Sequence, residues 1–185
     1  QGVFTPDDVL KGCELQSPVV VYDFDYYYMG GLIAEYISDL GHEVTIITPF
    51  ENVSPWSFMS NEVNEIKARM YEKNIKTITE NRISEFKNQA LTLTHKVTKE
   101  IIELDRSSLV IVGMRVPINS LYKELSSNQS MLDDAGIKTL KNIGDSNSPG
   151  AVVHAVYAGH MYANTFDSDV DDDPYDFKFE YPVIQ

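Results

Sequence analysis

The chain has 185 residues, with 28 acidic and 15 basic side chains and a formal net charge of -13. This charge argues against nucleic acids and anionic membranes as partners, because both bind clustered lysine and arginine side chains. No apolar run is long enough for a membrane-spanning helix. The single cysteine, Cys13, excludes an intrachain disulfide and a cysteine-ligated iron–sulfur cluster, so we expect a reducing compartment, most simply the cytoplasm.

Residues 1–18 predict an irregular lead-in. They contain neither an initiator methionine nor the charged and apolar regions of a signal peptide, so we expect a chain that is processed or is a piece of something longer. Within this segment, Thr5-Pro6-Asp7-Asp8 predicts a capped turn, because threonine caps helices and proline suits the first helical position.

A β-α-β unit follows the lead-in. The apolar run Val19–Tyr22 predicts a buried strand, and Val44–Ile47 predicts a second strand parallel to it. Between them we expect a helix that ends before Gly41, a residue type common just past a helix. Five apolar side chains recur along it at helical spacing: Leu32, Ile33, Tyr36, Ile37 and Leu40.

The remaining sequence predicts further short elements. We expect helices over 61–72, 121–126 and 152–164, and strands over 75–79, 83–87, 90–97, 108–112 and 139–143. Residues 167–185 form an acidic C-terminal tail, which begins like a calcium loop but lacks the glycine and the terminal glutamate that such a loop needs. His154 and His160 are six residues apart and do not share a helical face, so we predict no metal site.

The turn after the first buried strand stands where dinucleotide-binding domains carry their glycine fingerprint. Here Asp23 and Asp25 hold the first two glycine positions, and Gly30 matches the third. Two carboxylates would repel a pyrophosphate and occupy its space. The scaffold therefore predicts a Rossmann-like domain, and the turn argues against NAD or NADP as its ligand.

Two interpretations of this turn stay open. Asp23 and Asp25 cap the amides of the following helix, in place of a phosphate, or they bind an amine or a metal ion. Likewise, Tyr26, Tyr27 and Tyr28 either pack the turn against a neighbouring layer or form an aromatic cage for a methylated amine.

A second candidate site lies at Asn142-Ile143-Gly144-Asp145. A short strand that ends in Gly-Asp before a helix rich in small residues is typical of the point where the first nucleotide domain closes in flavoproteins with two dinucleotide folds. Gly144 and Asp145 are therefore candidate ligands of an ADP- or FAD-type nucleotide. The alternative is a turn in which Asp145 only caps a helix.

Several segments together resemble the C-terminal region of the trimethylamine, dimethylamine and histamine dehydrogenase family, relatives of 2,4-dienoyl-CoA reductase and old yellow enzyme. The matching segments are Val19–Ile47 with its Asp-x-Asp-x-Tyr-Tyr-Met-Gly turn, Val53–Trp56, Leu109–Arg115 with Pro117 and Asn119, and Ile143–Asp145. Their order and spacing carry the resemblance, which extends from about Thr5 to Tyr181.

The resemblance implies a longer parent protein. Its N-terminal barrel would hold FMN near a four-iron–four-sulfur cluster, and two nucleotide-fold domains would follow, the first carrying ADP or FAD. Residues 19–120 would be a degenerate NAD(P)-type domain, and residues 121–166 the returning segment of the ADP/FAD-type domain. The implied fold class is α/β, a Rossmann-like three-layer domain of the two-dinucleotide-binding flavoprotein type with part of a second nucleotide domain. The barrel and the first nucleotide half-domain would be this chain's partners, in an oligomer that passes electrons to an electron-transferring flavoprotein.

We therefore expect the C-terminal nucleotide-fold part of a flavin- and iron–sulfur-dependent amine dehydrogenase or demethylase. This part would be structural, without catalytic residues and inactive by itself, and it would hold no cofactor when alone. Two alternatives are a free-standing degenerate Rossmann-like interaction module and a NAD(P)H-dependent reductase domain. Asp23 and Asp25 argue against the reductase.

Overall fold

The structure is a computed structural model that describes residues 2–87, 90–105, 108–113 and 115–166. The chain divides into two compact units, Gln1–Met114 and Arg115–Gln185. Within the described ranges, none of the helices has the length and apolar character needed to cross a membrane.

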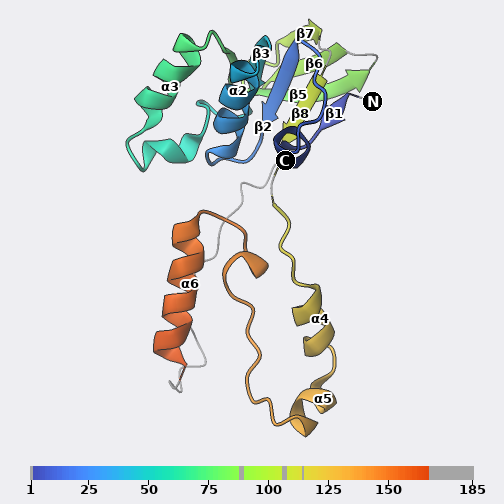
Figure 1. The fold of residues 1–185 in the computed structure, drawn as a ribbon, viewed down its shortest axis with the longest axis vertical. Coiled ribbons are helices and arrows are strands. Elements are labelled where there is room, and N and C mark those ends of the chain that lie inside the picture. Colours follow the sequence, from blue (N-terminus) through green and yellow to red (C-terminus); the bar gives the residue numbers. More distant parts are fainter. Residues whose placement is uncertain (1, 88–89, 106–107, 114, 167–185) are drawn as a thin grey trace. The chain divides into compact units, whose positions relative to one another are not determined.

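The first unit is built on a parallel sheet of five strands (Figure 1). In spatial order these are β1 (Val3–Phe4), β8 (Ser108–Val112), β2 (Val19–Asp23), β3 (Val44–Ile47) and β4 (Lys76–Ile78). All four neighbouring pairs run parallel, and Val19 is paired with Val44. The predicted parallel pairing of the first two buried strands is therefore confirmed.

Helices cover one face of this sheet: α1 (Pro6–Leu10), α2 (Met29–Asp39) and α3 (Val63–Glu72), with a short 3-10 helix, η1 (Pro55–Phe58). Alternate strand residues, such as Val19 and Val21, pack against Ile33 and Ile37 of α2 and Ile66 of α3. The helices therefore enclose the larger of the two apolar cores.

A small antiparallel sheet covers the opposite face. It consists of β5 (Asn81–Lys87), β6 (Ala90–His95) and β7 (Ile101–Asp105). Val20 and Leu109 of the parallel sheet pack there against Leu91 and Leu93. Because both faces are covered, the central strands are continuous apolar runs. The predicted α/β fold with three layers is confirmed.

The five apolar residues expected along α2 lie on two different faces of the helix, one buried and one exposed. Ile33 and Ile37 are fully buried, whereas Leu32, Tyr36 and Leu40 are exposed. The other residues on the buried face are the small residues Gly30, Gly31 and Ala34, which allow the helix to pack closely against the sheet. The expected end of the helix is confirmed, since α2 stops at Asp39 and Gly41 has a φ of 90°.

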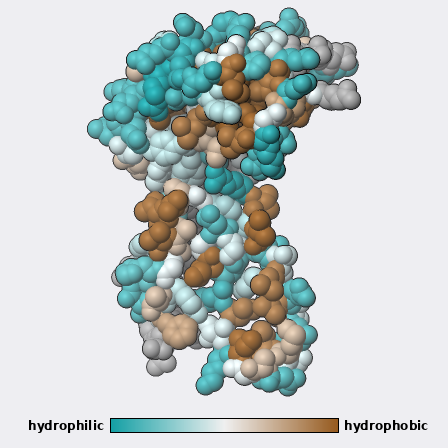
Figure 2. Space-filling view, viewed as in Figure 1, coloured by the Kyte–Doolittle hydropathy of each residue, from teal (hydrophilic) through white to brown (hydrophobic). Residues whose placement is uncertain are grey.

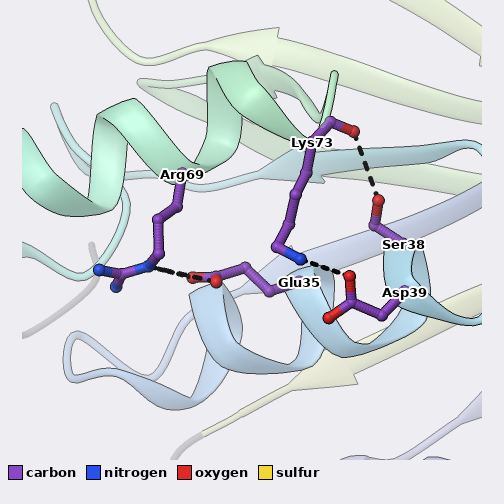
Figure 3. A network of polar contacts seen from close by, with 5 residues as sticks. All are labelled: Glu35, Ser38, Asp39, Arg69 and Lys73. Carbon is purple, nitrogen blue, oxygen red and sulfur yellow. Dashed lines mark hydrogen bonds and ion pairs between the residues drawn. The ribbon is translucent and has the colours of Figure 1, made fainter.

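Two ion pairs join α2 to α3 (Figure 3). The Nε of Arg69 donates to both carboxylate oxygens of Glu35, at 3.0 and 3.2 Å. One turn further along, the side chain of Lys73 pairs with Asp39. The backbone carbonyl of Lys73 accepts a hydrogen bond from the Ser38 hydroxyl. These contacts fix the distance between the two helices at their solvent side.

The N-terminal segment is ordered, contrary to the irregular lead-in expected. Val3–Phe4 pairs with Leu109 and Val110 of β8. The predicted capped turn is the start of α1: Asp8 N donates to Thr5 Oγ1, and Thr5 N donates to Asp8 Oδ2. This reciprocal capping box stabilises a five-residue helix that would be marginal alone.

The described part of the second unit, residues 115–166, buries few apolar side chains. It contains α4 (Ser120–Ser126), α5 (Gln129–Asp134), a 3-10 helix η2 (Gly144–Ser146) and α6 (Val152–Thr165). Within residues 115–166, Leu132 is the single buried apolar side chain. Figure 2 shows apolar side chains spread over the surface of this unit. Seven apolar side chains of residues 115–166 are more than 60% exposed: Val116, Ile118, Leu121, Val152, Val153, Val156 and Phe166.

The predicted strand Thr139–Ile143 is wrong for the chain as described, because residues 137–143 form neither helix nor strand. A strand needs a neighbour for its backbone hydrogen bonds, and no described residue of this chain pairs with it. The C-terminal tail expected over residues 167–185 lies outside the described residues.

Candidate functional site at the carboxyl edge of the parallel sheet

The order of the parallel strands reverses between β2 and β8. The chain proceeds from β2 to β3 and β4 on one side, whereas β8 lies on the other. At this point Asp23 is paired with Val112, and the backbone amide of Phe24 donates to the Val112 carbonyl at 2.8 Å. Ligands of open α/β sheets bind beyond the carboxyl ends of strands at such a reversal. Any ligand of the first unit is therefore expected beside Asp23.

Asp23 is fully buried, with an exposed fraction of 0%. Its Oδ1 accepts a hydrogen bond from the backbone amide of Asp25 at 3.1 Å, and its Oδ2 has no hydrogen-bond partner among the described residues. The pKa of this carboxyl is raised to about 7, mainly by burial; the backbone amides of Asp25 and Ser54 lower it, and the nearby charge of Asp25 raises it. The uncharged acid is therefore favoured to a higher pH than in an exposed aspartate.

The Asp23 carboxyl also lies directly against the start of α2. A Cβ atom placed on Gly30 would overlap with the Cγ and both oxygens of this carboxyl. The hypothesis that Asp23 caps the helix amides is wrong, because its hydrogen bond comes from the turn, at Asp25, and not from α2. The carboxyl packs on the helix without being bound by it.

The loop after β3 closes the other side of the α2 N-terminus. A Cβ on Gly31 would lie 3.2 Å from Oγ of Ser54. Ser54 has a φ of 51°, a left-handed conformation that costs energy for a residue with a side chain. Oγ of Ser54 and Oγ of Ser57 are buried and have no hydrogen-bond partner among the described residues. Both glycines therefore permit close packing with the protein's own side chains.

The tyrosine run packs the turn onto this loop. Tyr26 meets Phe50 edge-on at 5.2 Å between ring centroids, and Tyr27 meets Trp56 at 5.5 Å. The hydroxyl of Tyr28 donates to Glu62 at 2.8 Å. The backbone amide of Trp56 donates to the Tyr26 carbonyl at 3.1 Å. These contacts favour the packing interpretation over the aromatic cage.

The second pair of candidates, Gly144 and Asp145, belongs to η2 of the second unit, whereas Gly30 belongs to the first unit. Gly144 has a φ of 63°, and a Cβ on it would lie 3.7 Å from Ala155 of α6. Oδ1 of Asp145 accepts a hydrogen bond from Gly150 N at 3.4 Å, just before α6 begins. The sequence-predicted site residues thus belong to two places, one in each unit.

Neither place offers an obvious reaction centre. The described ranges contain no group of three histidine, cysteine, aspartate or glutamate side chains able to hold a metal ion. A hollow of about 440 Å³ lies at the β1–β8 edge, lined by Val3, Phe4, Thr5, Pro6, Ile111 and Gly113. None of these side chains titrates. Sequence reasoning missed this hollow because it treated residues 1–18 as irregular.

Comparisons with known proteins agree with this geometry. The model of the OYE-like second alpha/beta domain family matches residues 4–108. The structure of histamine dehydrogenase from Rhizobium sp. 4-9 is 30% identical, with a TM-score of 0.85, over 94% of this chain and 27% of that one. The amine oxidase of 6-hydroxypseudooxynicotine from Pseudomonas geniculata N1 is 27% identical, with a TM-score of 0.74, over 85% of this chain and 23% of that one.

Dimethylamine dehydrogenase from Hyphomicrobium sp. (strain x) is 24% identical over an alignment of 180 residues that covers 87% of this chain and 24% of that protein. The chain thus spans about a quarter of the length of these relatives. The expected resemblance to the amine dehydrogenases is confirmed, and the relatives support an oxidoreductase-related domain. Because the family model covers more than half of the residues, the chain belongs to the OYE-like second alpha/beta domain family.

Proposed function

We propose that this chain is the C-terminal nucleotide-fold part of a larger flavin-dependent oxidoreductase that acts on C–N bonds. The relatives named dimethylamine dehydrogenase and histamine dehydrogenase support an amine as the substrate of the whole protein. FMN and a four-iron–four-sulfur cluster would be held by the parent's barrel, outside this chain. Within the parent, residues 19–120 form the degenerate NAD(P)-type domain, and residues 121–166 return to the ADP/FAD-type domain.

One observation carries this proposal: the second unit leaves its apolar side chains uncovered. Val152, Val153 and Val156 of α6 are 79%, 61% and 65% exposed. Burial of an aliphatic side chain contributes about 1.5–3 kcal/mol, so residues 115–166, with one buried apolar side chain, gain little from folding alone. The missing half-domain of the parent would cover α6 and pair with residues 139–143.

The role in the parent is structural. Asp23, whose pKa is raised to about 7, has the titration range of a general acid or base. Its side chain is 0% exposed, however, so it offers no accessible atom to a substrate in this chain. Gly144 and Asp145 would contribute to a nucleotide shelf once the other half of that domain is present. The whole protein would work in the cytoplasm as an oligomer and pass electrons to an electron-transferring flavoprotein.

A recombination experiment tests the proposal. The parent upstream of Gln1 is produced as a separate polypeptide and mixed with this chain, and complex formation and flavin content are measured. We expect a stable complex and amine oxidation only in the mixture or in the uncut parent. The double variant Val152→Thr, Val156→Thr should weaken the complex at least about tenfold. Val97→Thr, at a site that is 70% exposed in the first unit, is the matched control. Equal affinity of both variants would contradict the proposed contact.

A further inference from the structure

The ligand phosphate of a dinucleotide fold normally lies against glycines at the start of the first helix, where backbone amides and the helix dipole attract it. In this chain an acidic group is already there. The Asp23 carboxyl lies against Gly30, the second residue of the eleven-residue α2. Both of its oxygens would overlap with a Cβ atom on Gly30, and Oδ1 accepts a hydrogen bond from the backbone amide of Asp25 in the turn.

The second observation concerns Asp23 itself. Its side chain is fully buried, and its Oδ2 has no hydrogen-bond partner among the described residues. A buried oxygen without a hydrogen-bond partner destabilises the folded state, and such groups are rare. Asp23 therefore lowers the stability of the fold at a position where dinucleotide-binding domains have glycine.

The glycines of the turn are explained by the same contact. Gly30 has no room for a side chain because of Asp23, and Gly31 has little because of Ser54. Neither glycine requires a ligand for its explanation. In this chain the two glycines leave room for the side chains of Asp23 and Ser54, and not for a phosphate.

We propose that the Asp23 carboxyl occupies the space of the ligand phosphate and is the residue by which this domain excludes NADH, NADPH and related adenine dinucleotides. The exclusion is by volume at Gly30. Asp25 is half-buried and contributes its backbone amide to the carboxyl. The inference concerns the first unit alone and goes beyond the proposed role in a larger enzyme, so either can fail without the other.

The test compares four forms of the 185-residue chain: the unchanged protein, Asp23→Gly, Asp23→Asn and Asp25→Gly. Binding of NADPH, NADH and ADP-ribose is titrated by calorimetry, after circular dichroism has shown that each form is folded. We expect Asp23→Gly to bind ADP-ribose at least about tenfold more tightly than the unchanged chain. Asp23→Asn keeps the volume without the charge and should bind no better than the unchanged chain. Asp25→Gly should also show no gain.

Three results would overturn the proposal. The unchanged chain could bind a dinucleotide with a Kd below about 100 µM. A folded Asp23→Gly could show no gain. Asp23→Asn or Asp25→Gly could gain as much as Asp23→Gly, which would assign the exclusion to charge or to Asp25. If Asp23→Gly does not fold, Asp23→Ala replaces it, and the probe is inorganic pyrophosphate with NMR shifts of the Gly30 and Gly31 amides as the readout. Absent shifts would then refute the proposal.

Discussion

The carboxyl group of Asp23 occupies the space that a side chain at position 30 would need. Asp23 ends β2 and Gly30 lies in the first turn of α2, so this contact joins the strand to the helix it precedes. The identity of each residue depends on the other: glycine is required at 30 while aspartate is at 23.

Gly30→Ala should therefore destabilise the first unit. Overpacking of a tight site costs about 1–3 kcal/mol, although alanine is the better helix former. We expect thermal unfolding to occur several degrees lower. In the Asp23→Ala background the same substitution should cost far less, because the carboxyl that it meets is gone. Equal costs in both backgrounds, measured by a double-mutant cycle, would refute the contact.

The stability of the chain should depend on pH through Asp23. Its folded pKa of about 7 lies above the value of about 3.9 for an unfolded aspartate, so the folded state binds more protons between these two pH values. The stabilising contribution of protonated Asp23 to the free energy of unfolding is fully present below pH ~4. It is lost as pH rises toward 7 and changes no further above that.

Denaturation by urea at pH 5, 6, 7 and 8 measures this effect. The slope attributable to Asp23 should approach about 1.4 kcal/mol per pH unit in the lower part of this range. Asp23→Asn should remove it. Asp8 and Glu62, whose pKa values are lowered by hydrogen bonds that Thr5 and Ser60 respectively donate, act only in more acidic solution and are the same in both proteins. If the free energy of unfolding of Asp23→Asn depended on pH with the same slope, the raised pKa of the buried Asp23 carboxyl would be contradicted.

The ion pair Glu35–Arg69 should stabilise the chain more than the pair Glu43–Lys76. The Glu35 side chain is 14% exposed and accepts two hydrogen bonds from Arg69, whereas Glu43 is 58% exposed and Lys76 67%. We expect Glu35→Gln to cost about 1 kcal/mol and Glu43→Gln less than about 0.5 kcal/mol. Chemical denaturation with urea at low salt measures both, and a larger effect for Glu43 would contradict the geometry of Figure 3.

Hydrogen exchange should separate the two units. Amides of β2 and β8, buried between two layers, are expected to exchange slowest, whereas those of α6 should exchange rapidly because few apolar contacts hold it. The upstream polypeptide, once bound, should slow the exchange of α6. Strong protection of α6 in the isolated chain would show that the second unit is stable by itself.

The sequence predicted the sheet well where burial is two-sided. Val19–Tyr22 and Val44–Ile47 are continuous apolar runs, and only a covered parallel strand explains such runs. β7 was missed although Ile102 and Leu104 alternate with exposed residues, a pattern that could have identified it. β1 has two residues and is held only by its pairing with β8, so no local signal identifies it.

The position of the candidate site could be predicted from the sequence, but the contacts of the Asp23 side chain could not. The turn after β2 was identified from its place between strand and helix. Whether Asp23 would cap the helix or pack against it depended on the direction of one buried side chain, which spacing does not determine. The strand over 139–143 was predicted from local β propensity, and its formation depends on neighbours that this chain does not supply.

The most direct test of the proposed function is the mass and flavin content of the polypeptide that carries this sequence in its natural source. The relatives are about four times as long as the part they share with this chain. We predict a species of about four times 20.9 kDa, with a flavin absorption spectrum. A lone species of 20.9 kDa, free of flavin and of any flavin-bearing partner, would contradict the account and favour a free-standing interaction module.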